Sequence, residues 1–124
     1  MNYSEMTDFE INCAVAASLG REFFYNSPGE LGKRRKSFVI DDVCRDVYES
    51  GAWSSDVFDP CKSWADAGPI ILANKITISA PMQYDQPEDW LAYPSSDSDI
   101  CVFHPSPLRA AMIVFLMMQE QTNA

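Results

Sequence analysis

The chain has 124 residues, 47% of them hydrophobic and 12% aromatic, so it is long enough to form a core and too apolar to be intrinsically disordered. Its 18 acidic and nine basic side chains give a formal net charge of −9. Because phosphate binding requires a surplus of lysine and arginine, this charge speaks against nucleic acid and anionic membranes as partners. We expect one globular domain over residues 1–124.

Residues that hold metals and cofactors are scarce. The four cysteines lie far apart in the sequence, and His104 is the only histidine, whereas a zinc site needs paired ligands. Sequence motifs of phosphate-binding loops, metalloproteases and calcium loops are absent. We therefore expect no metal and no cofactor, and the sequence favours a non-enzymatic protein. The acidic N-terminal residues do not resemble a signal peptide, so reduced thiols and a cytoplasmic location are expected.

The first predicted element is a helix over residues 8–19. Thr7 and Glu10 have the spacing of a capping box, in which each side chain satisfies the backbone N–H of the other residue. Apolar residues then recur at helical spacing, so one face is expected to be buried. They are Ile11, Ala14, Val15 and Leu19. Gly20 predicts a left-handed residue that ends the helix.

Two short strands, 21–26 and 36–40, are predicted on either side of a turn rich in glycine and proline. The segment 41–50, DDVCRDVYES, stays open between helix and strand, because Val43 and Val47 suit both.

Four of the nine basic residues form one cluster, Lys33, Arg34, Arg35 and Lys36. This basic cluster is the candidate partner-binding site, because it is suited to phosphate, RNA or an acidic protein surface. The alternative is a charged edge that keeps a strand from pairing with a neighbour.

A second helix is predicted over residues 60–73, with Asp59 as its cap and Pro60 at its first position. The expected buried stripe runs past Pro69, so we predict one helix that is kinked there. The stripe consists of Cys61, Trp64, Ala65, Gly68, Ile71 and Leu72. Cys61 is interpreted as a buried, inert thiol rather than one activated by the helix dipole.

Three further strands are predicted at 75–80, 90–93 and 100–104, the first from its alternating pattern. His104, at the end of the last strand, is interpreted as structural or exposed, because no motif marks a serine nucleophile that would pair with it.

The last helix is predicted over residues 107–119, with Ser106 as its cap and Pro107 at its first position. It is too short to cross a bilayer, which takes about 20 apolar residues. Because it is apolar on all sides, it should be central in the core. The helix dipole disfavours Arg109 in the first turn, so we expect Asp59 or Asp66 to hold this side chain. Together the elements predict an α+β fold with a small, mainly antiparallel sheet and three helices.

Three segments resemble the NinX family of small phage proteins, whose function is unknown: MNYSEMTDFEINCAVAASLG, FDPCKSWADAGPII and HPSPLRAAMIVFLMMQE. The order of the elements is also distantly similar to phage α-β-α sandwich domains. The structural motif residues within the matching segments are Asp59, Pro60, Cys61, Trp64, Pro107 and Arg109. The resemblance implies a temperate phage of enteric bacteria, and it carries over no catalytic residue.

The prediction is therefore a non-enzymatic accessory protein that acts in the cytoplasm of the bacterial host and binds a host or phage macromolecule, with a protein partner expected. A flat apolar patch flanked by acids would favour this function. Two alternatives stay open. A small-molecule or nucleotide-binding protein that sequesters its ligand would have a deep pocket lined by Trp90, Tyr93 or the basic cluster. An acidic mimic of nucleic acid would show carboxylates in rows like those of phosphates.

Overall fold

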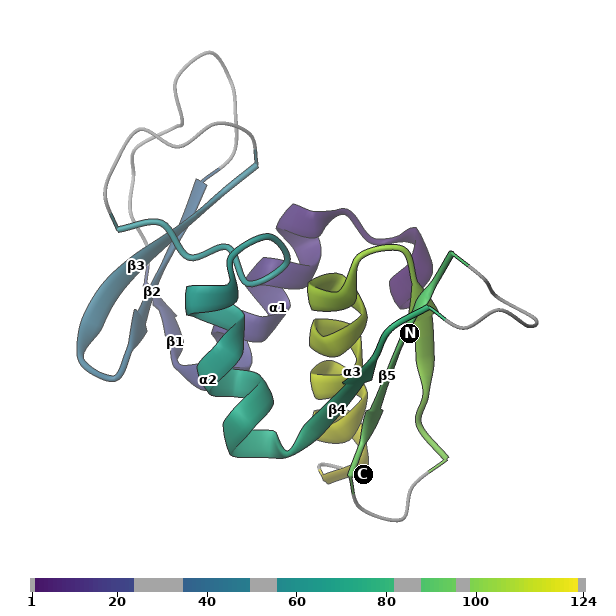
Figure 1. Ribbon diagram of the computed structural model, residues 1–124. Coiled ribbons are helices and arrows are strands. Elements are labelled where there is room, and N and C mark those ends of the chain that lie inside the picture. Colours follow the sequence, from purple (N-terminus) through teal and green to yellow (C-terminus); the bar gives the residue numbers. More distant parts are fainter. Residues whose placement is uncertain (1, 24–34, 50–55, 82–87, 96–98, 123–124) are drawn as a thin grey trace. The chain divides into compact units, whose positions relative to one another are not determined.

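The computed structural model describes residues 2–23, 35–49, 56–81, 88–95 and 99–122 (Figure 1). The chain divides into two compact units, Met1–Asp59 and Pro60–Ala124. Each unit has its own three-stranded antiparallel sheet, so the strands form two sheets where the sequence led us to expect one. The α+β class is confirmed, and the single domain over residues 1–124 stays a prediction.

The first unit contains a short 3-10 helix and one α-helix, η1 (Tyr3–Glu5) and α1 (Asp8–Leu19), and strands β1 (Arg21–Phe23), β2 (Arg35–Ile40) and β3 (Val43–Tyr48). Its sheet has the order β1-β2-β3, and α1 packs against all three strands. The predicted capping box is confirmed. The Thr7 hydroxyl accepts from the Glu10 N–H at 3.1 Å, and the Glu10 carboxylate accepts from the Thr7 N–H at 3.0 Å.

Gly20 ends α1 in a different way from the one predicted. Its φ of −152° lies outside the left-handed region. A Cβ atom at this position would lie only 2.0 Å from the carbonyl oxygen of Val39, which is the partner of Arg21 in the sheet. The chain therefore needs glycine here because the backbones of α1 and β2 approach closely, and not because of a left-handed cap.

The segment that was open between helix and strand is strand β3. Asp41 and Asp42 connect β2 to β3 with positive φ angles of 52° and 63°, and Ile40 pairs with Val43 across them. Two consecutive residues with positive φ make the hairpin turn whose twist matches that of the flanking strands. Aspartate tolerates this conformation better than most residues do.

The second unit contains helix α2 (Trp64–Asn74), strands β4 (Ile76–Ser79), β5 (Trp90–Pro94) and β6 (Val102–His104), and helix α3 (Pro107–Thr122). The sheet has the order β4-β5-β6. As Figure 1 shows, α3 lies along this sheet and α2 lies beside α3.

Helix α3 is the central element of its unit, as predicted. It contacts all three strands and α2, and every residue from Leu108 to Leu116 is at most 9% exposed. Ser106 caps it, because its hydroxyl accepts from the Arg109 N–H at 3.3 Å and its carbonyl from the Ala110 N–H at 3.1 Å. Pro107 is its first residue.

Helix α2 begins at Trp64, four residues later than predicted, and continues across Pro69. Its cap is Ser63, whose hydroxyl accepts from the Asp66 N–H at 3.3 Å, so the prediction of Asp59 as the cap was wrong. The carboxylate of Asp59 instead accepts from the Asn12 side chain at 2.8 Å, within the first unit. Residues 60–62 form turns before the helix.

The predicted buried stripe of α2 was correct for Cys61, which is buried just before the helix, and wrong for Trp64 and Leu72, which are largely exposed. The buried residues of the helix itself are Ala67 and Ile70. Because α2 packs against α3, the side that carries Ala67 and Ile70 is covered, and Trp64 and Leu72 lie on the other side.

Candidate functional site

One side of α2 is an exposed apolar surface. Trp64 is 58% exposed and Leu72 is 80% exposed, although both side chains are large and apolar. Asp66 is the only ionisable residue between Trp64 and Asn74. We name this side of the helix the α2 platform, and its residues are Trp64, Ala65, Gly68, Pro69 and Leu72. Because large exposed apolar surfaces often mark sites of interaction, the α2 platform is the candidate site.

The α2 platform has no side chain at its centre, at Gly68, and we name this open position the notch. Trp64, Gly68 and Leu72 are four residues apart, so they form one row along the surface of the helix. Apart from its two chain neighbours and the backbone of its own helix, a Cβ atom at Gly68 would meet no atom within 4 Å. The row therefore has a large side chain at each end and open space between them. This is the shape into which a side chain of another helix packs.

Two lysines lie close to the two ends of α2. Lys62 precedes the helix and Lys75 follows it, and both are exposed. Lys75 ends α2 with a φ of 55°, and its N–H donates to the Leu72 carbonyl at 3.3 Å. Neither amino group forms an ion pair with a residue in the described part of the chain. A flat apolar patch flanked by acids would have favoured a protein partner, whereas α2 has lysines near its two ends.

The basic cluster is only partly described. Lys33 and Arg34 lie outside the described residues, while Arg35 and Lys36 begin β2. The Lys36 amino group is 3.7 Å from the Glu22 carboxylate of β1. β2 is the middle strand of its sheet, so Arg35 and Lys36 do not belong to an edge strand. A role of the cluster in binding stays a prediction.

A buried polar group connects β2 and β3 in the first unit. Ser37 and Asp46 face each other across the two strands, and both are buried. The Asp46 carboxylate accepts from the Ser37 hydroxyl at 2.6 Å and from the Tyr48 hydroxyl at 3.4 Å. These bonds satisfy a carboxylate inside the fold. Their effect is to stabilise the hairpin.

Cys44 lies on β3, the strand that also carries Asp46. It is exposed and is not part of a disulfide. Desolvation and the nearby carboxylates of Asp46 and Asp56 raise the pKa of the Cys44 thiol. The thiolate is the nucleophilic form of cysteine. A raised pKa therefore lowers the fraction of reactive thiolate at neutral pH, which speaks against a catalytic role for this side chain.

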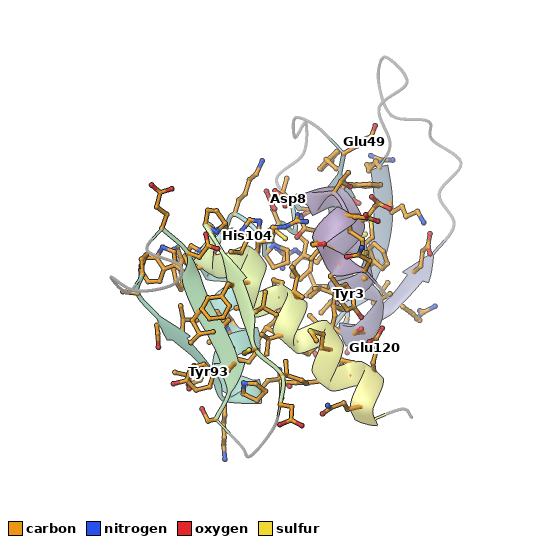
Figure 2. The ribbon with its side chains drawn as sticks, turned by 90° about the vertical axis from the view of Figure 1, so that its right-hand side faces the viewer. Tyr3, Asp8, Glu49, Tyr93, His104 and Glu120 are labelled. Carbon is orange, nitrogen blue, oxygen red and sulfur yellow. The ribbon has the colours of Figure 1, made fainter. Side chains whose placement is uncertain are left out.

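The remaining predicted residues have structural positions. His104 Nδ1 accepts from the Ser106 N–H at 2.9 Å, and Figure 2 shows His104 near the start of α3. Cys61 and Pro60 are buried, as the interpretation of Cys61 as a buried thiol requires. Arg109 is also buried. Its predicted carboxylate partner, Asp59 or Asp66, stays a prediction.

A further exposed apolar residue lies on the sheet of the second unit. Phe103 of β6 is 46% exposed and pairs with Leu91 of β5. Side chains alternate along a strand, so Phe103, Leu91 and Tyr93 share the face opposite to that of the fully buried Ala92. In Figure 2 Tyr93 extends from the side of the sheet away from α3. This surface serves as a comparison for the α2 platform.

Among the residues that the structure describes, no three side chains of the metal-binding types lie together as a metal site would require. No helix in the described ranges is long and apolar enough to cross a membrane.

The chain matches a known protein family. The family model described as "Bacteriophage P22, NinX" matches residues 2–119, which is nearly the whole chain. No curated protein and no solved structure matches the chain.

Proposed function

We propose that this chain, which belongs to the NinX family of bacteriophage P22, is a non-enzymatic accessory protein of a temperate phage that acts by binding a host or phage protein. One observation carries the proposal. The α2 platform exposes Trp64 and Leu72 on a helix side that has no charged residue. Free energy is gained when a partner removes such side chains from water.

The chemistry of the α2 platform favours a protein over the other classes of partner. Nucleic acid is bound through lysine and arginine side chains that neutralise phosphates, and this chain has a formal net charge of −9. Small molecules are bound in concave sites, whereas the α2 platform is the outer side of a helix. Tryptophan is also enriched among the residues that dominate protein interfaces.

The test is a comparison of variants in a pull-down from lysates of infected and uninfected bacteria. Leu72→Glu places a charge on the α2 platform, Phe103→Glu places the same charge on the sheet, and a third variant replaces the basic cluster with alanine. Bound proteins are identified by mass spectrometry, and the absorbance of the eluate at 260 nm reports nucleotides and nucleic acid. Circular dichroism first establishes that each variant is folded.

The proposal expects a protein that the wild type and Phe103→Glu retain at near-stoichiometric amounts and that Leu72→Glu loses. If only the basic-cluster variant loses the bound protein, the binding site is Lys33–Lys36 and not the α2 platform, and the proposal for the α2 platform is wrong. A co-eluting absorbance at 260 nm without a protein would contradict the proposal. It would favour the nucleotide-binding alternative instead.

A further inference from the structure

We infer that the partner of the α2 platform is an α-helix that carries a bulky aliphatic side chain at its centre and carboxylates at both ends of its apolar side. This inference rests on the proposed function, since it names the chemistry of the partner for the same surface. Three features of α2 lead to it: the notch at Gly68, the length of the helix, and the lysines at its two ends.

The notch favours a partner helix that has an apolar side chain at its centre. Trp64 and Leu72 lie four residues before and after Gly68 in the same row, and a Cβ atom at Gly68 would meet no atom within 4 Å apart from its chain neighbours and the backbone of its own helix. When two helices pack, a side chain of one enters the space between side chains four residues apart on the other. A leucine, isoleucine or methionine at the crossing point of the partner would fill this space. An extended strand would present alternate side chains to opposite sides, and it would leave the notch poorly filled.

Lys62 and Lys75 favour a partner helix that has acidic residues at its two ends. Lys62 and Lys75 are exposed at the two ends of an 11-residue helix. Such a helix is about 16 Å long. A partner helix that follows the α2 platform would therefore need its carboxylates about 11 residues apart to reach both amino groups. Because both ends of the α2 platform carry the same charge, this condition is the same for either direction of the partner helix.

The same charges disfavour a second copy of the chain. An antiparallel pair of α2 helices would bring Lys62 of one copy near Lys75 of the other, and a parallel pair would bring each lysine near its equivalent. Both arrangements place like charges together, which costs affinity. The formal net charge of −9 on each copy adds repulsion at longer range.

The local charge and the total charge predict opposite partners, and this makes the inference testable. The total charge of −9 favours a basic partner, whereas Lys62 and Lys75 favour acidic ends. We would select from a library of helical peptides displayed on yeast. The peptides are randomised at one central position and at two end positions about 11 residues apart. The bait is the full chain, with Leu72→Glu as the counter-selection bait.

The expected result is enrichment of leucine, isoleucine or methionine at the centre and of aspartate or glutamate at both ends. A selected peptide should bind about tenfold more tightly than the same peptide with lysine ends, since each exposed ion pair contributes modestly and both ends act together. The double variant Lys62→Glu/Lys75→Glu should reverse this preference. Gly68→Leu should weaken binding about tenfold or more, whereas Ala73→Leu, with the same bulk outside the Trp64–Gly68–Leu72 row, should not.

Three results would overturn the inference. Enrichment of lysine or arginine at the ends, or no charge preference, would show that the partner chemistry is wrong; if binding still required Leu72, the proposed function would stand. No enrichment that depends on Leu72 would remove the α2 platform as a binding surface, and with it the proposed function. Sedimentation of the wild type as a dimer that Leu72→Glu dissociates would identify a second copy as the occupant.

Discussion

Helices α2 and α3 pack against each other in the second unit, and both are apolar around most of their circumference, yet their surroundings are opposite. In α3 every residue from Leu108 to Leu116 is buried, because the helix contacts three strands and α2. Within the same unit α2 contacts α3 and β4, and its buried residues are Ala67 and Ile70. The apolar residues of α3 are accounted for by the core. The apolar residues on the outer side of α2 are not covered by the core. This exposed apolar surface is the observation on which the proposal of a partner rests.

The prediction with the largest expected effect tests this difference in burial by making the same substitution, leucine to alanine, in both helices. Leu116 is 5% exposed and Leu72 is 80% exposed. Leu116→Ala should lower the free energy of unfolding by about 2–5 kcal/mol, because it removes buried methyl groups and leaves a cavity. Leu72→Ala should change it by less than about 0.5 kcal/mol. Chemical denaturation measures both values, and a cost of several kcal/mol at Leu72 would show that α2 is covered on both sides in the free protein.

The sequence predicted those parts of the fold that local interactions determine. Thr7 and Glu10 cap α1 with each other, and Ser106 with Pro107 starts α3, so both helices begin where they were predicted. The long apolar run of α3 required burial on most sides, and this prediction of a central helix was also correct.

The start of α2 depended on a distant contact and was not predictable in this way. Asp59 and Ser63 are both good caps, but the Asp59 side chain binds Asn12, 47 residues away in sequence. The covered side of α2 was equally ambiguous. A stripe through Trp64 and Leu72 and a stripe through Ala67 and Ile70 are both apolar, and only the position of α3 decides between them. The candidate site was therefore missed because its residues were assigned to the core.

Pro69 gives the next largest effect. A proline in the interior of a helix costs about 3 kcal/mol, because it cannot donate to the carbonyl of residue 65 and its ring crowds the preceding turn. Pro69→Ala should therefore raise the free energy of unfolding by about 1–3 kcal/mol. Pro69 is exposed, so the substitution leaves no cavity. Denaturant titration checks the prediction, and an unchanged midpoint would indicate that α2 already relieves the strain by a local change in geometry.

The cap of α2 has a smaller effect. Ser63→Ala should lower the free energy of unfolding by about 1 kcal/mol, because the Asp66 N–H loses its acceptor. A double-mutant cycle separates the two candidate caps. Asp59→Ala and Asn12→Ala should be non-additive, since the two side chains form one hydrogen bond, whereas Asp59→Ala and Ser63→Ala should add. Coupling between Asp59 and Ser63 would contradict the assignment of Ser63 as the cap.

Among the substitutions that are expected to change stability, Gly68→Ala has the smallest effect, and it gives the most direct information about the notch. Alanine in place of glycine inside a helix stabilises by about 0.5–1 kcal/mol, because glycine loses more backbone freedom on folding. The open space around the Cβ position of Gly68 lets Gly68→Ala show this gain in full, as a higher denaturation midpoint. A loss of stability would mean that another part of the chain enters the notch in the free protein. In that case the apolar residues on the outer side of α2 would be part of the core, and α2 and α3 would no longer differ in burial.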